Sequence, residues 1–256
     1  MIVRLIFCAA IPLIMCTASA QQAAEPLGAD CSVEQILDAL HARGIGLKDL
    51  SADVSLTETD ALTGDATTLV GRAWYKPVED GQGRLRVVFD LKKVGDRQDR
   101  QFKQEYLLDK GWLIERDYRR RIQIDRQVLK PGQKMNLLKL GEGPFPLPIG
   151  QPREDVLKMF EVSRVAPADG DPPQTVRIRL KPRPQTRFAR RFKTIDVWVG
   201  MADHFPRRIE TVDLRETETK TTDLDNIRVN SGLDDKHFEL EKVEGWTVKS
   251  EPLDDI

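Results

Sequence analysis

The sequence predicts a mainly β protein, built on a curved antiparallel sheet that forms an incomplete, half-open barrel with a few helices as a lid. About ten segments alternate apolar and polar residues, which is the period-2 pattern of strands with one buried face. Short turns join most of these segments, as antiparallel neighbours allow and parallel neighbours do not. A sheet of this size must curl or close to protect its edges, and only three short helical segments could cover its inner face. We therefore expect a partly filled apolar interior, of the kind that binds ligands.

Residues 1–20 are predicted to be a cleaved secretory signal peptide. Arg4 precedes a short apolar run, and Ala18-Ser19-Ala20 supplies the small residues of a cleavage site. The run is too short to cross a membrane as a helix. Cleavage after Ala20 would place the protein in the periplasm, with a tether over residues 21–30 and one domain over residues 31–256. The alternative is lipid modification of Cys16, which would anchor the chain, although Met15 is bulky where that motif requires a small residue.

The composition excludes several classes of protein. Removal of the signal peptide removes Arg4 and no acidic residue, so the 40 basic residues become 39 against 41 acidic ones. This balance provides no long-range attraction to nucleic acid, and we expect no nucleic-acid partner. Cys31 is the only cysteine after residue 20, so the mature chain cannot form an intrachain disulfide. A secreted chain without disulfides must build its own core, which this length allows for one domain.

The first half of the domain reads as one helix followed by strands. Ser32 and Gln35 form an S-x-x-Q capping box ahead of an amphipathic helix that ends at Gly44. The alternating patterns then predict strands over residues 50–57, 68–76, 85–91, 102–108 and 112–128.

Residues 131–150 interrupt this alternation with an apolar segment that is rich in glycine and proline. Such a segment is neither a central strand nor a polar loop, and its large apolar side chains need a hydrophobic surface to lie against. Pro152 then begins a helix that extends to Phe160. The pattern is consistent with a movable cover inserted between two halves of the sheet, and equally with a plug that completes an ordinary core.

The last third of the chain predicts more strands. Residues 176–181 alternate, a basic connector covers residues 187–193, and residues 193–248 read as an antiparallel meander closed by Asn230-Ser231-Gly232. Nothing in this block suggests catalysis. We expect it to form the second wall of the apolar interior.

Several short motifs, taken in order, make the chain resemble the LolA-type periplasmic lipoprotein carriers over most of its mature length. The early strand motif is Gly71-Arg72-Ala73-Trp74-Tyr75-Lys76-Pro77, and the turn Asp109-Lys110-Gly111-Trp112 matches more loosely. The best-matching block runs through Leu224-Asp225-Asn226-Ile227-Arg228-Val229-Asn230, Asp234–Phe238 and Gly245-Trp246-Thr247-Val248. Each motif is weak alone; their order and spacing are what resemble the family.

The resemblance implies a carrier that binds lipoprotein acyl chains, or other lipids, in a hydrophobic cavity and ferries them toward the outer membrane. It further implies an inner-membrane release complex and an outer-membrane receptor as partners, and we expect a monomer. Where the family has an arginine that latches the lid, this chain has Lys76, which lacks the bidentate geometry of arginine. The candidate lipid-binding residues are Val54, Leu56, Trp74, Leu85, Val87, Phe89, Leu138, Phe145 and Leu147.

Two other classes of function are considered. A lipid- or lipoprotein-binding sensor, or an outer-membrane receptor-like module, could use the same fold. An enzyme is not expected, because the sequence has no G-x-S-x-G motif and no histidine pair at metal-ligand spacing. No catalytic residue, metal site or cofactor is therefore assigned.

Overall fold

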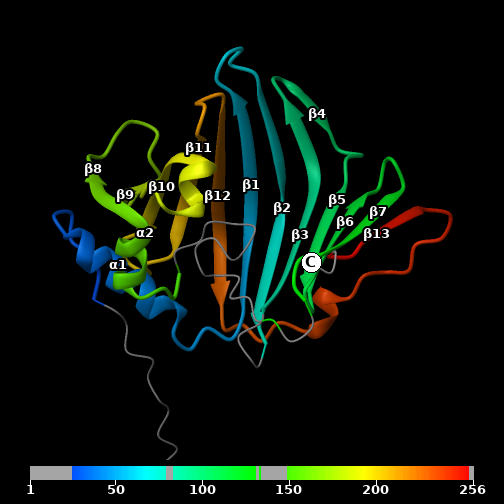
Figure 1. The fold of residues 1–256 in the computed structure, drawn as a ribbon, viewed down its shortest axis with the longest axis horizontal. Coiled ribbons are helices and arrows are strands. Elements are labelled where there is room, and N and C mark those ends of the chain that lie inside the picture. Colours follow the sequence, from blue (N-terminus) through cyan, green and yellow to red (C-terminus); the bar gives the residue numbers. More distant parts are fainter. Residues whose placement is uncertain (1–24, 79–82, 131–132, 134–148, 254–256) are drawn as a thin grey trace, which may run out of the picture.

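The protein is built on a single mixed sheet. The structure is a computed structural model that describes residues 25–78, 83–130, 133 and 149–253. Within these residues the sheet has 13 strands in the order β13-β7-β6-β5-β3-β2-β1-β12-β11-β10-β9-β8, with β4 paired to β3 alone. The edge strands β8 and β13 lie at opposite ends of this order and do not pair (Figure 1). The sheet curves without closing, so the predicted incomplete barrel is confirmed.

The chain builds the sheet outward from its middle in two passes. The first pass contains β1 (Leu50–Asp60), β2 (Ala66–Pro77), β3 (Gly83–Val94), β4 (Arg97–Asp99), β5 (Gln104–Asp109), β6 (Trp112–Asp117) and β7 (Ile122–Gln127). The second pass returns from the opposite edge through β8 (Phe160–Val165), β9 (Thr175–Pro182), β10 (Phe192–Gly200), β11 (Pro206–Asp213) and β12 (Glu218–Val229). Strands β1 and β12 then pair antiparallel from Leu50↔Val229 to Asp60↔Glu218, which joins the two halves.

The strands differ from the sequence prediction in several details. Strands β4 and β8 were not predicted, and the predicted helix to Phe160 ends one residue earlier. The segment from Trp112 to Val128, predicted as one strand, is the hairpin β6–β7, in which Arg121 adopts a positive φ of 52° at the turn. The last strand, β13 (Thr247–Glu251), pairs parallel to β7, whereas the other paired strands described here are antiparallel. A parallel neighbour needs a long connection, and the chain from β7 to β13 spans residues 128–246, which include β8–β12.

Two helices lie on the inner face of one half of the sheet. Helix α1 (Val33–Gly44) has the predicted capping box, since the backbone N–H of Gln35 donates to Ser32 Oγ and that of Ser32 donates to Gln35 Oε1. Its buried face packs with the short helix α2 (Arg153–Met159) against apolar side chains of β8–β11, among them Phe160, Ile178 and Ile195. Among the described residues, these helices cover the β8–β11 half and leave the β1–β3 half of the inner face without a helix (Figure 1).

The C-terminal segment covers part of the outer face of the other half. The short 3-10 helix η3 (Asp235–Phe238) places His237 against Trp74, with ring centroids 5.5 Å apart. Beneath this segment the carboxylate of Glu105, whose residue is 1% exposed, accepts hydrogen bonds from Arg86 Nε and the Tyr118 hydroxyl, both at 2.7 Å. A buried carboxylate needs such partners, and these hydrogen bonds satisfy Glu105 beneath the C-terminal segment.

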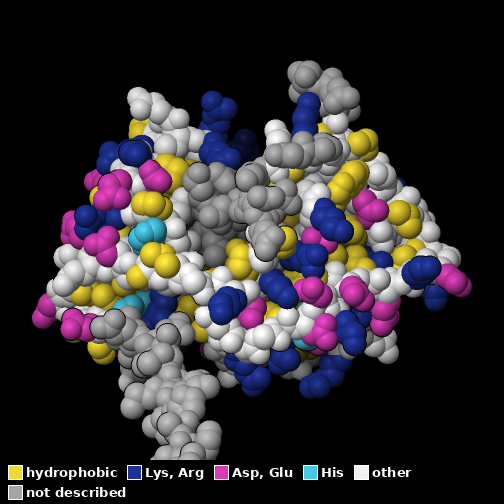
Figure 2. Space-filling model, turned by 90° about the horizontal axis from the view of Figure 1, so that it is seen from below, with side chains coloured by type: hydrophobic (Ala, Val, Ile, Leu, Met, Phe, Trp, Pro, Cys, Tyr) yellow, Lys and Arg dark blue, Asp and Glu magenta, His cyan; other side chains and the backbone are white. Residues whose placement is uncertain are grey.

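The described helices include none with the length and apolar character needed to span a membrane. Seen from below, the surface of the molecule has basic and acidic side chains intermixed among apolar ones (Figure 2).

Candidate functional site

A cavity of about 290 Å³ lies on the inner face of the sheet, where the two halves meet. Its walls are side chains of β1, β2 and β3 on one side and of β11 and β12 on the other. The apolar part of its lining includes Leu50, Ala52, Tyr75, Leu85, Phe205 and Ile227. A concave and mostly apolar lining of this kind is typical of a site for an apolar ligand.

The strand register brings the lining residues together. Val54 pairs with Leu224 on β12 and with Gly71 on β2, so these three positions lie on the same inner face. Gly71 is required by close packing, because a Cβ there would lie 1.8 Å from the carbonyl oxygen of Val88. The absence of a side chain at Gly71 lets the backbone of β3 approach β2 closely, where the β2–β3 register shifts between Val70 and Gly71.

One end of the cavity is polar. Lys220 Nζ lies 2.7 Å from Glu58 Oε1 and 3.5 Å from Glu218 Oε2, and all three residues line the cavity. Burial of Lys220 lowers its pKa, but the hydrogen bond and the negative charge of Glu58 outweigh this effect, so the pKa lies above its ordinary value. Lys220 is therefore charged at neutral pH. The cavity thus changes from apolar at Leu50 to ionic at Lys220.

The segment that leads into α2 covers part of the cavity. Ile149 is buried and lines the cavity. The next residue, Gly150, donates its backbone N–H to the carbonyl oxygen of Leu40, 3.0 Å away on α1. A Cβ on Gly44 would lie only 2.2 Å from Gly150 Cα, so the two glycines allow the segment to pack directly on the end of α1. This contact fixes Ile149 over the cavity.

Eight of the nine predicted lipid-binding residues fall into three groups: four line the cavity, one lies beside it, and three lie outside the described residues. Val54, Leu56, Leu85 and Val87 line the cavity together. Phe89 is buried next to them in the same apolar cluster and packs edge-on against Tyr106, with ring centroids 6.3 Å apart. Leu138, Phe145 and Leu147 lie outside the described residues. Ligand binding by any of these residues stays a prediction.

Trp74 and Lys76 lie on the outer face, which corrects the expected position of Trp74. Neighbouring residues of a strand point to opposite faces, and Tyr75 is the one that lines the cavity. Trp74 stacks on His237, as described above. Lys76 Nζ donates to Asp235 Oδ1 at 2.7 Å and to the carbonyl oxygen of Leu233 at 3.3 Å. Among described residues Lys76 therefore contacts the C-terminal segment. Most of the expected lid lies outside the described residues, so a lid contact of Lys76 stays a prediction.

Residues of the far wall were not named from the sequence. Residues 193–248 were expected to form the second wall, and Ile209, Thr222 and Leu224 do face the cavity from β11 and β12. The alternation in these strands was visible in the sequence. Their register against β1 was not, and the register decides which residues point inward.

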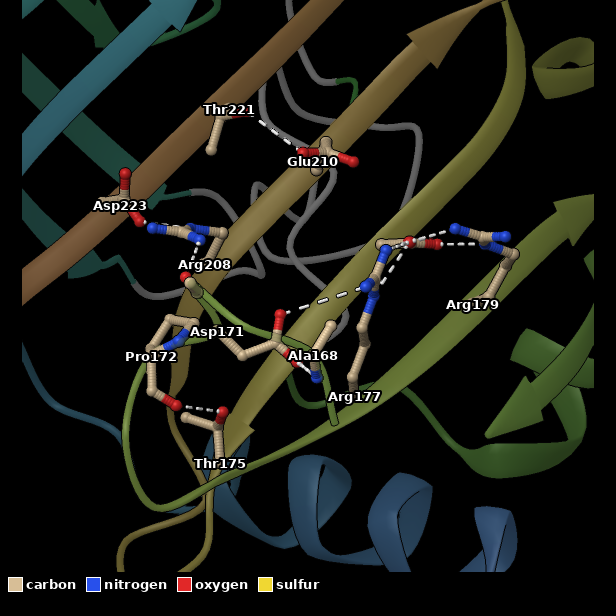
Figure 3. A network of polar contacts seen from close by, with 12 residues as sticks. Ala168, Asp171, Pro172, Thr175, Arg177, Arg179, Arg208, Glu210, Thr221 and Asp223 are labelled. Carbon is tan, nitrogen blue, oxygen red and sulfur yellow. Dashed lines mark hydrogen bonds and ion pairs between the residues drawn. The ribbon is translucent and has the colours of Figure 1, made fainter. Parts of the chain in front are cut away.

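A second cluster of charges lies on the outer face of β9–β12 (Figure 3). The carboxylate of the buried Asp196 accepts from Arg179 Nε and Nη2, both at 2.7 Å, and from Arg177 Nε at 3.0 Å. The guanidinium of Arg177 also lies 4.3 Å from the ring centroid of Trp198. Arg208 donates to Asp223 Oδ1 at 2.6 Å and to the carbonyl oxygen of Gly170 at 2.8 Å. Because these groups satisfy one another, the cluster is structural.

Metal-binding groups were also sought within the part of the chain that the structure describes. No group of three or more histidine, cysteine, aspartate or glutamate side chains there could hold a metal ion.

Comparison with known proteins gives structural similarity only. No family model and no curated protein matches the chain. Similar solved structures include an uncharacterized conserved protein from Thermus thermophilus, at 11% identity and a TM-score of 0.47, covering 84% of this chain and 97% of the other. A LolA superfamily protein from Nitrosomonas europaea matches at 10% identity and a TM-score of 0.32, covering 82% and 98%. LprF from Mycobacterium bovis matches at 15% identity and a TM-score of 0.40, covering 78% and 94%.

These neighbours include a member of the superfamily that the sequence resembles. At these identities and TM-scores the similarity carries no information on function.

Proposed function

We propose that the protein binds the acyl chain of a lipid or of an acylated protein in the cavity between β1–β3 and β11–β12. The observation that supports this proposal is the change along the cavity from apolar side chains at Leu50 and Tyr75 to the ionic group around Lys220. An acyl chain with a polar head has the same two-part chemistry. Burial of such a chain contributes about 0.8 kcal/mol per CH₂, which is sufficient for tight binding in water.

The specific role that we propose is a periplasmic carrier. It would take acyl chains of lipoproteins from an inner-membrane release complex and deliver them to an outer-membrane receptor. This role is consistent with the predicted signal peptide and with the motifs that resemble the lipoprotein carriers. Transport of this kind requires binding and release without covalent chemistry, because a receptor with a better apolar site draws the ligand away.

Binding can be tested with two neighbouring residues of β12. Thr222 lines the cavity, whereas Thr221 pairs with Glu210 and points to the outer face. We expect Thr222→Trp to fill part of the cavity and to weaken binding of a fluorescent fatty-acyl probe by about tenfold or more. Thr221→Trp is the matched control, with the same change in the same strand, and should leave the affinity unchanged.

A second measurement addresses the natural ligand. Native mass spectrometry of protein purified without detergent should show bound acyl lipid or lipopeptide. An empty protein that also fails to bind the acyl probe would exclude the proposed function.

A further inference from the structure

A strongly basic segment connects β9 and β10. Residues 181–193 contain Lys181, Arg183, Arg187, Arg190, Arg191 and Lys193 and no acidic residue. All six side chains belong to exposed residues, and the segment includes the 3-10 helix η2 (Arg187–Arg190). Basic and acidic side chains are intermixed on much of the described surface seen in Figure 2. The acyl-binding cavity proposed above does not require such a concentration of cations.

Five of the six cations form no ion pair with a described residue, and of these five Lys181 alone lies opposite an acidic residue in a strand ladder. Lys193 pairs with Glu216 at 2.5 Å, and Lys181 lies opposite Glu161 in the β8–β9 ladder. Arg183, Arg187, Arg190 and Arg191 form no ion pair with any described residue. Their positive charges therefore remain available to an external anionic partner.

The core holds this segment in place. Phe188 in η2 is buried and packs against Phe160, with ring centroids 4.9 Å apart. The guanidinium groups of Arg187 and Arg191 lie over the rings of Phe188 and Phe192, at 5.6 and 5.1 Å from the centroids. The arginines are thus displayed on an anchored support, which lowers the entropy lost when they bind.

The basic segment belongs to the rim of the cavity. Arg191 and Phe192 line the cavity, and the carbonyl oxygen of Arg191 accepts from the backbone N–H of Leu214 at 3.0 Å in the β11–β12 turn. The β11–β12 turn also contacts the β1–β2 turn, because the backbone N–H of Ala61 in the β1–β2 turn donates to the carbonyl oxygen of Thr217, 2.9 Å away in the β11–β12 turn. The segment and the two turns therefore form one continuous edge.

Each of the two turns exposes a leucine. Leu62 is 82% exposed in the β1–β2 turn and Leu214 is 53% exposed in the β11–β12 turn. Three of the acidic groups here have partners, because Asp60 and Asp213 accept backbone N–H groups of their own turns and Glu216 pairs with Lys193. The exposed carboxylate of Asp65 has no described partner. We call Arg183, Arg187, Arg190 and Arg191, together with Leu62 and Leu214, the basic rim.

We propose that the basic rim docks the protein on the surface of an anionic lipid bilayer. Arginines near an anionic surface each strengthen binding on the order of fivefold at low salt, and apolar side chains at turn tips can enter the interfacial region. A bilayer fits the rim better than an acidic protein does, because the two leucines project singly from turns and do not form a groove. Docking would bring the polar end of the cavity, around Lys220 and Glu218, toward the membrane. The inference holds whatever molecule occupies the cavity.

The test is co-sedimentation of the full mature chain with phosphatidylcholine vesicles, with and without phosphatidylglycerol. We expect binding only to the anionic vesicles, and weaker binding as salt is added. The combined variant Arg183→Gln, Arg187→Gln and Arg190→Gln should weaken binding on the order of 100-fold. These three residues lie outside the cavity lining, so binding of the acyl probe should be unchanged.

The matched control removes three exposed cations at the other end of the sheet, with Arg119→Gln, Arg120→Gln and Lys249→Gln. It has the same net charge as the rim variant and should bind anionic vesicles like the wild type. Equal losses in both variants would show a general charge effect and overturn the proposal. The proposal is also overturned if the folded wild type binds polyglutamate through the rim but does not bind vesicles. Leu214→Ser should weaken vesicle binding without changing its salt dependence, since it removes no charge.

Discussion

At the scale of single residues, Asp49 connects the start of β1 to the loop that follows β12. Its residue is 3% exposed, and its carboxylate accepts from the N–H groups of Ser231, Gly232 and Leu233 at 2.8, 2.9 and 3.3 Å. The Ser231 hydroxyl donates a fourth bond at 3.1 Å. Burial raises the pKa of this carboxyl, but the four hydrogen bonds outweigh burial and hold the pKa below its ordinary value.

Asp49→Asn should therefore destabilise the protein. The amide keeps one acceptor oxygen and presents donors to N–H groups, which costs about 1–3 kcal/mol in the free energy of unfolding at neutral pH. A lowered folded-state pKa stabilises the protein above the unfolded-state value of about 3.9, and this contribution is lost as the pH falls below that value. Urea denaturation from neutral pH to about pH 3 should thus show the variant and the wild type converging.

Asp65→Asn is the control for this prediction. Asp65 is exposed, and its carboxylate forms no hydrogen bond or ion pair with a described residue. If Asp49→Asn were no less stable than Asp65→Asn at neutral pH, the loop contacts of Asp49 would contribute nothing.

The sequence predicts only some of the residues that face the cavity. Alternation correctly grouped Val54 and Leu56, and separately Leu85 and Val87, because every second residue of a strand shares a face. It could not decide between Trp74 and Tyr75, because both are large aromatic residues with a polar group and either could face inward. The outer position of Trp74 depends on His237, which lies far away in the sequence.

At the scale of elements, β13 completes one edge of the sheet. It adds to β7 in parallel, and Arg126 on β7 joins Glu251 on β13 at 2.6 Å and Glu115 on β6 at 2.5 Å. The described residues of β13 are all exposed, so the strand is held by backbone pairing and ion pairs and not by burial. This explains why the strand has no alternating pattern in its sequence. Helix α1 was predictable in full, because both its capping box and its apolar face are local.

Truncation before Thr247 should expose β7 as an edge strand. We expect a lower melting temperature and association that increases with protein concentration, because unpaired edges offer backbone groups to other chains. Calorimetry and size-exclusion chromatography at several concentrations would measure both. Glu251→Gln is the control, since it weakens the ion pair and keeps the strand. A truncated protein that stays monomeric and melts like the wild type would contradict this role.

At the scale of the whole molecule, the core is uneven. The described helices fill the inner face over β8–β11, whereas the inner face of β1–β3 borders the cavity. This asymmetry was only partly predictable: the count of strands and helices indicated an underfilled interior, but not which half would be filled. The decisive contact, between Gly44 and Gly150, joins positions that no local pattern relates.

An occupant of the cavity should stabilise the whole domain. A ligand that binds only the folded state, at 100 times its dissociation constant, adds about 2.7 kcal/mol to the free energy of unfolding. The acyl probe should therefore raise the melting temperatures of the wild type and of Thr221→Trp, as measured by calorimetry. It should raise the melting temperature of Thr222→Trp much less. Equal shifts in all three proteins would place the probe elsewhere on the molecule.

The pairing of β1 with β12 also has a consequence for the order in which the chain folds. Lys220 and Glu58, which face each other across this ladder, are 162 positions apart in the sequence. Contacts of such long range make folding slow, because the chain must close a large loop before they form. During synthesis the central ladder cannot form until β12 has emerged, so one edge of β1 stays unpaired while most of the chain is made.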